Sequence, residues 1–105
     1  MNEALVRRFM IPDAVKEAWE EAEKQIDSGL NDEALVTLRA AWEEHGDSAN
    51  HANTWKLVGD AKQAIAESTE PVSKKMLREA SDAYQSALKQ DSKHRDARRA
   101  SNAIQ

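Results

Sequence analysis

Residues that interrupt helices are rare in this chain and occupy a few separated positions. The 105 residues include only 3 Gly and 2 Pro, whereas Ala, Glu, Lys, Leu and Gln are abundant and β-branched residues are sparse. Because this mixture favours helix over strand, we predict an all-α chain. Pro12, Gly29, Gly46 and Pro71 fall where the helical pattern breaks, so they are expected to mark helix ends.

Apolar residues recur three and four positions apart in six segments, as in helices that bury one face. The sequence therefore predicts five or six antiparallel helices joined by short turns. Asp47 and Ser48 are expected to cap the fourth helix, and Asp91 and Ser92 the last, because their side chains accept backbone N–H bonds. The expected helices cover residues 2–10, 12–28, 31–45, 48–68, 72–90 and 92–105.

Acidic and basic side chains are separated along the chain. The net charge of −4 does not favour nucleic acid as a partner. Residues 13–47 hold eleven acids and three bases, whereas residues 72–105 hold eight bases and four acids. Solvated helix faces explain this asymmetry simply. A basic C-terminal partner site and head-to-tail self-association are the alternatives.

The composition also limits the compartment and the environment. The chain has no cysteine, which excludes disulfides and thiolate metal sites and fits a reducing compartment. No apolar run approaches the roughly 20 residues that a membrane span needs. The first residues, MNEALVRRFMIPD, lack the apolar stretch and cleavage site of a signal peptide. We expect a soluble, cytoplasmic protein without membrane contact.

Two parts of the sequence repeat one pattern of small and large residues. Residues 33–49 align with residues 79–97 at an offset of 46, and Ala18 and Ala22 align with Trp55 and Gly59 at an offset of 37. The difference between the offsets places nine extra residues between positions 64 and 78. This insertion is expected to add about one turn to each of the fourth and fifth helices.

A tryptophan followed four residues later by glycine, and then by small and aromatic residues in the next helix, resembles the tetratricopeptide repeat (TPR) family. The resemblance implies a single domain of two antiparallel helix hairpins, the second elongated, with a capping helix at each end. The implied segments are 1–11, 12–47, 48–91 and 92–105. The residues that carry the resemblance are Trp55, Leu57, Gly59, Ala80, Tyr84 and Ala87 in the second hairpin, and Ala18, Ala22, Gly29, Ala34, Leu38 and Ala41 in the first.

Small residues let the two helices of a hairpin approach closely, and large residues fill the gaps that remain. A glycine inside a helix costs about 1 kcal/mol relative to alanine, so Gly59 needs a compensating contact. We expect the backbone of the neighbouring helix to cross at Gly59.

The resemblance also implies a concave groove lined by the first helix of each hairpin. In that groove Trp19 and Ile26 would form an apolar anchor for a peptide. In the alternative, Trp19 is buried beneath the helix expected at 2–10, because Leu5 and Phe9 must pack on something. The predicted groove residues are Lys16, Trp19, Glu23, Ile26, Asn53, Lys56, Asp60 and Gln63.

No set of residues predicts catalysis or a metal site. His45, His51 and His94 lack the spacing of a helical metal site. The many carboxylate pairs lie in charged helices where nothing predicts burial. There is no glycine-rich phosphate loop and no serine in a nucleophile context. We expect a non-enzymatic protein without cofactor or metal.

Two further groups of residues carry an expectation. Trp42 and Trp55 lie on the apolar faces of their helices, so we expect both to pack in the core. The last helix carries a candidate basic patch, which is either a solvated helix end or a site for an acidic peptide or a neighbouring molecule. The residues of this patch are Lys93, Arg95, Arg98 and Arg99.

The sequence therefore favours a TPR-like adaptor or scaffold that binds a protein partner as a peptide or helix in its concave groove. The alternative is a homo-oligomeric assembly protein whose helical faces form a dimer. Two repeats are fewer than usually suffice alone, and the acidic and basic parts of the chain are complementary. An engineered repeat protein would show the same pattern.

Overall fold

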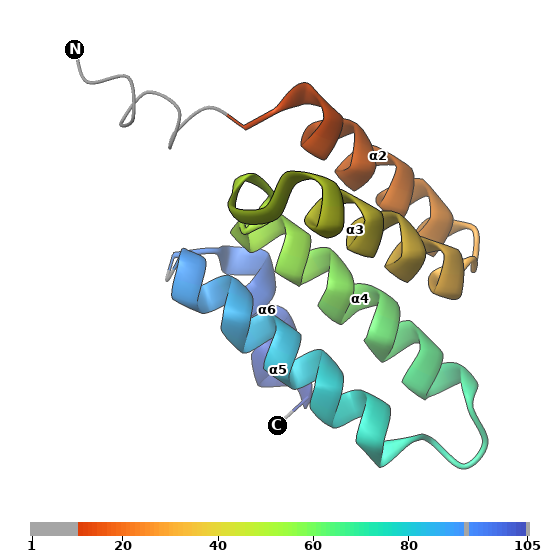
Figure 1. Ribbon diagram of the computed structural model, residues 1–105. Helices are drawn as coiled ribbons and strands as arrows, with labels where there is room; N and C mark the ends of the chain where they lie inside the picture. Colours follow the sequence, from red (N-terminus) through yellow and green to blue (C-terminus); the bar gives the residue numbers. More distant parts are fainter. Residues whose placement is uncertain (1–10, 92, 105) are drawn as a thin grey trace.

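The computed structural model describes residues 11–91 and 93–104. Within these ranges the chain forms five α-helices, one 3-10 helix and no strand (Figure 1), so the all-α prediction is confirmed. The helix expected at 2–10 lies outside the described residues, and so does the alternative that Leu5 and Phe9 cover Trp19. The elements are α2 (Asp13–Asp27), α3 (Asn31–His45), η1 (Gly46–Ala49), α4 (Ala52–Ser68), α5 (Lys74–Gln90) and α6 (Arg95–Ile104).

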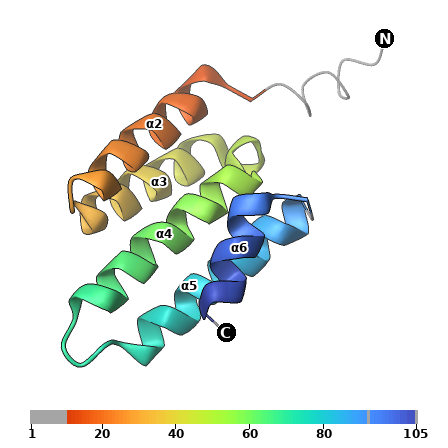
Figure 2. The ribbon, with the colours of Figure 1, turned by 180° about the vertical axis from the view of Figure 1, so that it is seen from behind.

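Helix α4 is the central element. Each helix packs against the next one along the chain, and α4 also contacts α2 and α6. In the view of Figure 1, α3 and α5 lie in front, whereas α2 and α6 lie in front when the molecule is seen from behind in Figure 2. Helix α4 therefore takes part in two surfaces, one with α2 and α6 and the other with α3 and α5.

Glycines end the first two described helices, as the sequence predicts. Gly29 follows α2 with a φ of 81°, and Gly46 follows α3 with a φ of 53°. Residues with a Cβ rarely adopt this left-handed backbone, so both helices stop where the sequence supplies a glycine.

The predicted cap of α4 is wrong. Asp47 and Ser48 lie within η1, and α4 begins only at Ala52. The Nδ1 atom of His51 accepts a hydrogen bond from the backbone N–H of Asn53 at 3.2 Å. A neutral imidazole here supplies the acceptor that the first turn of a helix needs.

Helix α6 begins in the same way, so its predicted cap is wrong too. The carboxylate of Asp91 accepts a hydrogen bond from the backbone N–H of Lys93 at 3.0 Å and shapes the preceding turn. The helix itself starts at Arg95. Its cap is His94, whose Nδ1 atom accepts a hydrogen bond from the backbone N–H of Ala97 at 3.2 Å.

Alanine fills most of the core. Small side chains let helix axes approach, and the few large ones fill the remaining space. One buried cluster joins α2, α3 and α4, and the second joins α4, α5 and α6. The first comprises Ala22, Ala34, Leu38, Leu57 and Ala61, and the second comprises Ala52, Ala80, Tyr84, Ala87 and Ala97.

Gly59 lies at a close contact between α4 and α5, as the sequence predicts, but the contacting group is different. A Cβ atom at Gly59 would lie 2.5 to 2.8 Å from three ring carbons of Tyr84. The phenol ring of Tyr84, and not the backbone of α5, therefore occupies the space that the missing side chain leaves. Because Tyr84 is fully buried, its packing offsets the poor helix propensity of glycine.

The inserted residues lengthen α4 and α5 by about one turn each, as the sequence predicts. Counted from the aligned residues, α4 continues 13 residues beyond Trp55, whereas α2 continues nine beyond Ala18. Helix α5 begins six residues before Ala80, whereas α3 begins three before Ala34. The connection at residues 69–73 is two residues longer than the one at residues 28–30, so the gains of four, three and two residues account for the whole insertion.

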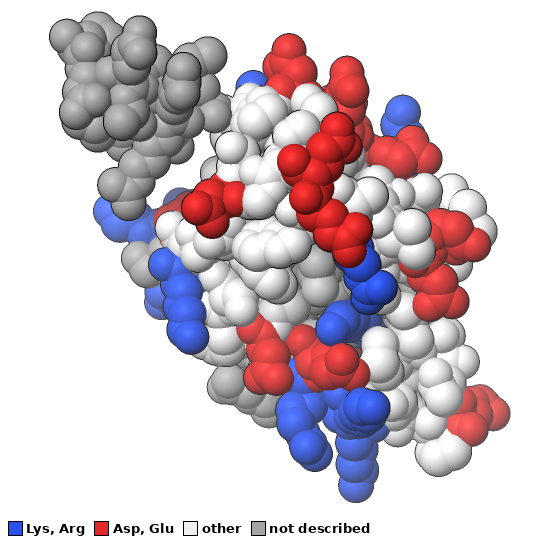
Figure 3. Space-filling model, in the orientation of Figure 1, with Lys and Arg blue, Asp and Glu red and all other residues white. Residues whose placement is uncertain are grey.

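Charge is distributed unevenly over the surface that α3 and α5 share with α4. In Figure 3, Asp and Glu side chains gather over α2 and α3, and Lys and Arg side chains gather near the start of α5. Further Asp, Glu, Lys and Arg side chains lie between them, beside uncharged surface. None of the helices within the described residues is long and apolar enough to cross a membrane.

Candidate functional site: the α2–α4–α6 groove

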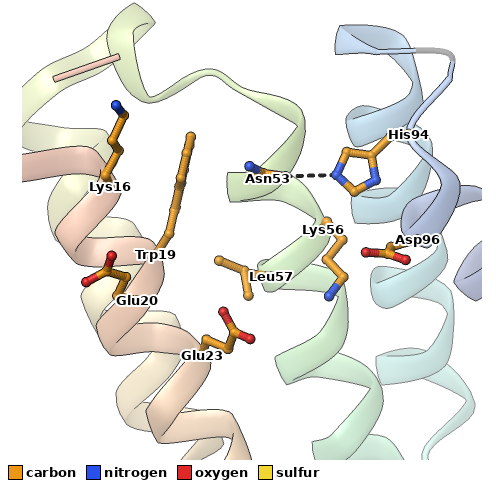
Figure 4. A pocket seen from close by; sticks show the side chains of 9 residues that line it. All are labelled: Lys16, Trp19, Glu20, Glu23, Asn53, Lys56, Leu57, His94 and Asp96. Carbon is orange, nitrogen blue, oxygen red and sulfur yellow. Dashed lines mark hydrogen bonds between the residues drawn. The ribbon is translucent and has the colours of Figure 1, made fainter. Parts of the chain in front are cut away.

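A groove of about 410 Å³ lies between α2, α4 and α6 (Figure 4). Its apolar part is formed by the ring of Trp19 and the side chain of Leu57, and charged side chains surround this part. We call it the α2–α4–α6 groove. Its lining residues are Lys16, Trp19, Glu20 and Glu23 from α2, Asn53, Lys56 and Leu57 from α4, and His94 and Asp96 at the start of α6.

Part of the predicted groove set lines this groove: Lys16, Trp19, Glu23, Asn53 and Lys56. The two helices that were expected to form the groove do so, because these residues recur at helical spacing on facing sides of α2 and α4. The groove therefore includes only the N-terminal part of the predicted set in each helix.

The remaining predicted residues, Ile26, Asp60 and Gln63, do not line the groove. Ile26 packs against the buried cluster between α2, α3 and α4. The hydroxyl of Tyr84 donates a hydrogen bond to Asp60 Oδ1 at 2.7 Å and lies 2.9 Å from Gln63 Oε1. These polar side chains therefore hold α5 against α4.

Sequence reasoning missed four lining residues. Glu20 follows Lys16 by four positions and so shares its helix face, a signal that could have found it. Leu57 is part of the TPR-like residue pattern, but the predicted groove set does not include it. His94 and Asp96 enter the groove because α6 folds back beside α4, and no local pattern predicts this placement.

Trp19 links the groove to the core. Its Nε1–H donates a hydrogen bond of 2.7 Å to the hydroxyl of the buried Thr54. The indole ring lies 5.0 Å from the His51 ring, at an interplanar angle of 44°. It also packs against the buried cluster between α2, α3 and α4. Its polar atom is thus satisfied inside the protein, and the part of the ring in the groove is apolar.

A hydrogen bond between α4 and α6 fixes one wall of the groove. The Nδ1 atom of His94 accepts from a backbone N–H, so the ring proton resides on Nε2. His94 Nε2 then donates to Asn53 Oδ1 over 2.8 Å. Asn53 therefore links the helix start capped by His51 to the one capped by His94.

His51 is held in its neutral form by its surroundings. Burial, and secondly the neighbouring His94, lowers the pKa of His51 below its usual value, and Asp91 opposes this shift. The neutral ring matches its role, because a protonated Nδ1 could not accept the hydrogen bond from Asn53. The start of α4 is therefore sensitive to acid.

The charged side chains around the groove are predominantly acidic. Lys56 forms an ion pair of 2.7 Å with Asp60, one turn further along α4. Within the described residues, no ion pair involves the other charged lining residues, Lys16, Glu20, Glu23 and Asp96. With Lys56 paired to Asp60, three lining carboxylates remain against the one unpaired ammonium group of Lys16, which favours a positively charged ligand.

The basic residues of the last helix lie near the groove but do not line it. Lys93, Arg95, Arg98 and Arg99 are exposed, and Asp96 interrupts them. Their helix buries Ala97 and Ser101 on the opposite side. In the described part of the chain, no three His, Cys, Asp or Glu side chains are grouped to hold a metal ion.

Trp42 is not a core residue, so its predicted packing role is wrong. Its side chain is 37% exposed and lies on the opposite side of α4 from the groove. The Trp42 and Trp55 rings meet edge to face at 5.3 Å. Trp55 is half-buried, and its Nε1–H donates to Asn50 Oδ1 at 2.9 Å. The core between α3 and α4 is already filled by Leu38 and alanines, which leaves Trp42 at the surface.

No protein-family model matches this chain, and comparisons with curated proteins and with solved structures give no significant match. The likeness to TPR repeats therefore depends on the pattern of residues in the sequence. The geometry and charge of the groove carry the functional proposal that follows.

Proposed function

We propose that this chain is a TPR-like protein-interaction module, an adaptor or scaffold without catalytic activity, that binds a peptide or helix in the α2–α4–α6 groove. The observation that carries the proposal is Trp19. A hydrogen bond to Thr54 and packing against the buried cluster hold its ring in place. The ring also lines an open groove. A rigid indole can bind an apolar side chain with little loss of conformational entropy.

The size of the groove supports a ligand that inserts one or two side chains. About 410 Å³ lies in the range of small ligand sites. The apolar part, formed by Trp19 and Leu57, suits an aromatic or leucine side chain. The acidic residues Glu20, Glu23 and Asp96 around it suit Lys or Arg on either side of that anchor. The proposed ligand is therefore a basic segment with one apolar anchor.

The repeat pattern supports the same kind of function. The aligned pairs Ala34/Ala80 and Leu38/Tyr84 are buried in the two clusters, and the groove lies along the first helix of each pair. Stacked helix pairs with a groove along their first helices are typical of peptide-binding repeat modules.

A selection from a random peptide library tests the proposal. The enriched peptides should combine an aromatic residue or leucine with neighbouring Lys or Arg. Glu23→Lys should weaken the selected peptides about tenfold, because it places a cation beside their basic residues. Glu23 is exposed and outside both core clusters, so this change should leave stability unaltered.

The matched control is Glu17→Lys, an equal change of charge on the same helix at an exposed residue outside the groove. At a salt concentration that screens long-range electrostatic attraction, its affinity for the peptides should stay within about twofold of the wild-type affinity. Equal losses in both variants, or peptide-induced amide shifts in the NMR spectrum confined to α3 and α5, would refute the groove as the binding site.

A further inference from the structure

A second surface, on the side of α4 opposite the groove, exposes apolar side chains. Trp42 is 37% exposed and Val36 67% exposed. A hollow of about 210 Å³ runs between α3 and α4 beside the indoles of Trp42 and Trp55. A second hollow of about 270 Å³ continues from it between α4 and α5. We call this surface the α3–α4–α5 face. Aromatic side chains are enriched in protein interfaces.

The α3 side of this face carries charges in the order negative, positive, negative. Asp32, Val36, Arg39 and Glu43 follow one another at spacings of four, three and four residues, so they share one side of the helix. All are exposed, and Arg39 lines the first hollow. None of the three charged residues forms an ion pair within the described residues.

Three residues on the α5 side carry the opposite order. Lys75, Asp82 and Lys89 recur at spacings of seven residues and are exposed. Asp82 lines the second hollow. Glu79 also lies on this side, but it already forms an ion pair of 3.3 Å with Lys62 of α4. Arg78 is also exposed, one turn before Asp82. Within the described residues, the charges without an ion pair along this side of α5 are therefore positive, positive, negative and positive.

The two rows of charge lie at the same level along the molecule. Trp55, Val58 and Lys62 of α4 line both hollows, so Arg39 on one side and Asp82 on the other flank the same stretch of α4. Helices α3 and α5 both run antiparallel to α4 (Figure 1), and they therefore run parallel to each other. The positive centre of one row thus lies level with the negative centre of the other.

We propose that a second copy of this chain docks on the α3–α4–α5 face, around a two-fold axis parallel to α4. Such an axis places α3 of each copy against α5 of the other. Arg39 then faces Asp82 of the second copy, and Asp32 faces its Lys75, because the two residues of each row are seven positions apart. Every contact occurs twice, as in any isologous interface.

This arrangement also covers the exposed apolar surface. The indoles of Trp42 and Trp55 lie between the two rows of charge, so they come together near the axis. Apolar residues at the centre and matched charges at the rim are the usual anatomy of a protein interface. The α2–α4–α6 groove lies on the other side of α4, so the dimer carries two open grooves that point away from each other.

Two charge reversals test the arrangement. Arg39→Glu places a carboxylate against Asp82 of the second copy, and Asp82→Arg places a guanidinium against its Arg39. Each reversal therefore creates two like-charge contacts in its own homodimer and should raise the dimer Kd at least about tenfold. In an equimolar mixture of the two variants, both contacts in the heterodimer pair opposite charges.

The measurement is sedimentation equilibrium for each variant, with native mass spectrometry of the mixture after one variant has received a mass tag. The wild-type chain should dimerise, more weakly at about 0.5 M salt than at about 0.05 M salt. The mixture should form the heterodimer with near wild-type affinity. The control variants Lys24→Glu and Glu17→Lys change charge equally at exposed positions of α2 and should dimerise like the wild type.

The proposal fails if the wild-type chain remains monomeric at about 1 mM. It also fails if either reversal dimerises as tightly as the wild type, or if the mixture forms no heterodimer. Circular dichroism of each variant establishes that the helices are intact. Because Arg39 and Asp82 are exposed, neither reversal should alter them.

Discussion

The two helix pairs, α2–α3 and α4–α5, pack through aligned residues that differ in size. In the repeat, Ala22 aligns with Gly59, and Leu38 aligns with Tyr84. Ala22 and Leu38 are buried in one cluster, whereas the ring of Tyr84 leaves no room for a Cβ at Gly59. The larger residue of the second pair is thus accommodated by the loss of a methyl group on the facing helix.

The pairs also differ in the polar contacts that support them. Neither α2 nor α3 has a side-chain cap at its start. His51 caps α4 and Ser73 caps α5, each with a hydrogen bond to a backbone N–H. The hydroxyl of Tyr84 adds a bond to Asp60 across the second pair. The stability of the second pair therefore depends more on polar side chains than that of the first, and it should vary more with pH.

The largest expected effect comes from filling the space at Gly59. Gly59→Leu forces four side-chain carbons against the Tyr84 ring, which has no free space around it. We expect a loss of about 3 kcal/mol in the free energy of unfolding, measured by urea denaturation. Ala40→Leu, at an exposed position in α3, is the control and should change stability by less than about 0.5 kcal/mol. An unchanged midpoint for Gly59→Leu would show that the contact is absent.

Removal of the Tyr84 hydroxyl should destabilise the protein less, and the stability that this hydroxyl contributes should be lost at alkaline pH. Burial, followed by the hydrogen bond to Asp60, raises the pKa of Tyr84 far above its usual range. The stability that this shift provides is present below about pH 10, the unfolded value, and is lost as the pH rises through the folded pKa. At neutral pH, Tyr84→Phe should cost about 1 kcal/mol for the lost bond.

Absorbance provides a direct measurement, because Tyr84 is the only tyrosine of the chain. In an alkaline titration, tyrosinate absorbance should rise together with the loss of helical circular dichroism. A tyrosinate transition near pH 10 in protein that is still fully helical would contradict the burial of this hydroxyl.

The smallest effect concerns the cap of α4 under acid. The pKa of His51 is lowered in the folded state, so its contribution is present above the unfolded value of about 6.5 and is lost as the pH falls through the folded pKa. Unfolding free energy should therefore decrease by up to about 1 kcal/mol, the usual worth of a cap, as acid removes the Nδ1 acceptor. Thermal unfolding at a series of pH values measures it.

The variant His51→Asn keeps a side chain that caps the helix but removes the group that is protonated in acid. Asparagine is a good cap and does not titrate between neutral and acidic pH. The stability of this variant should fall less steeply with acid than that of the wild type. His45→Asn, in α3 and outside this network, should keep the wild-type slope. Identical slopes in the wild type and His51→Asn would rule out His51 as the acid-sensitive group.

Helix ends and buried positions could be predicted well wherever neighbouring residues in the sequence determine them. Gly29 and Gly46 end α2 and α3 because a left-handed residue is needed there, and the burial of the aligned alanines follows from helical spacing. The starts of α4 and α6 were misplaced, because histidine is not a preferred cap and its role depends on the path of the preceding turn. The ring contact at Gly59 required knowledge of how α5 lies on α4.

The groove shows the same division between local and long-range causes. Lys16, Trp19 and Glu23 could be placed from the spacing within α2. His94 and Asp96 could not, because α6 reaches the groove only through its packing on α5 and α4. The exposure of Trp42 depends in turn on how completely smaller residues fill the space between α3 and α4.

The central claim is that Gly59 and Tyr84 form one size-matched contact, equivalent to Ala22 and Leu38. A double-mutant cycle of Gly59→Ala, Tyr84→Leu and the combined variant tests it, because the combination recreates the first pair within the second. Each single change should destabilise, and the combined variant should lose at least about 1 kcal/mol less than the sum of the two. Additivity within about 0.3 kcal/mol would contradict the claim.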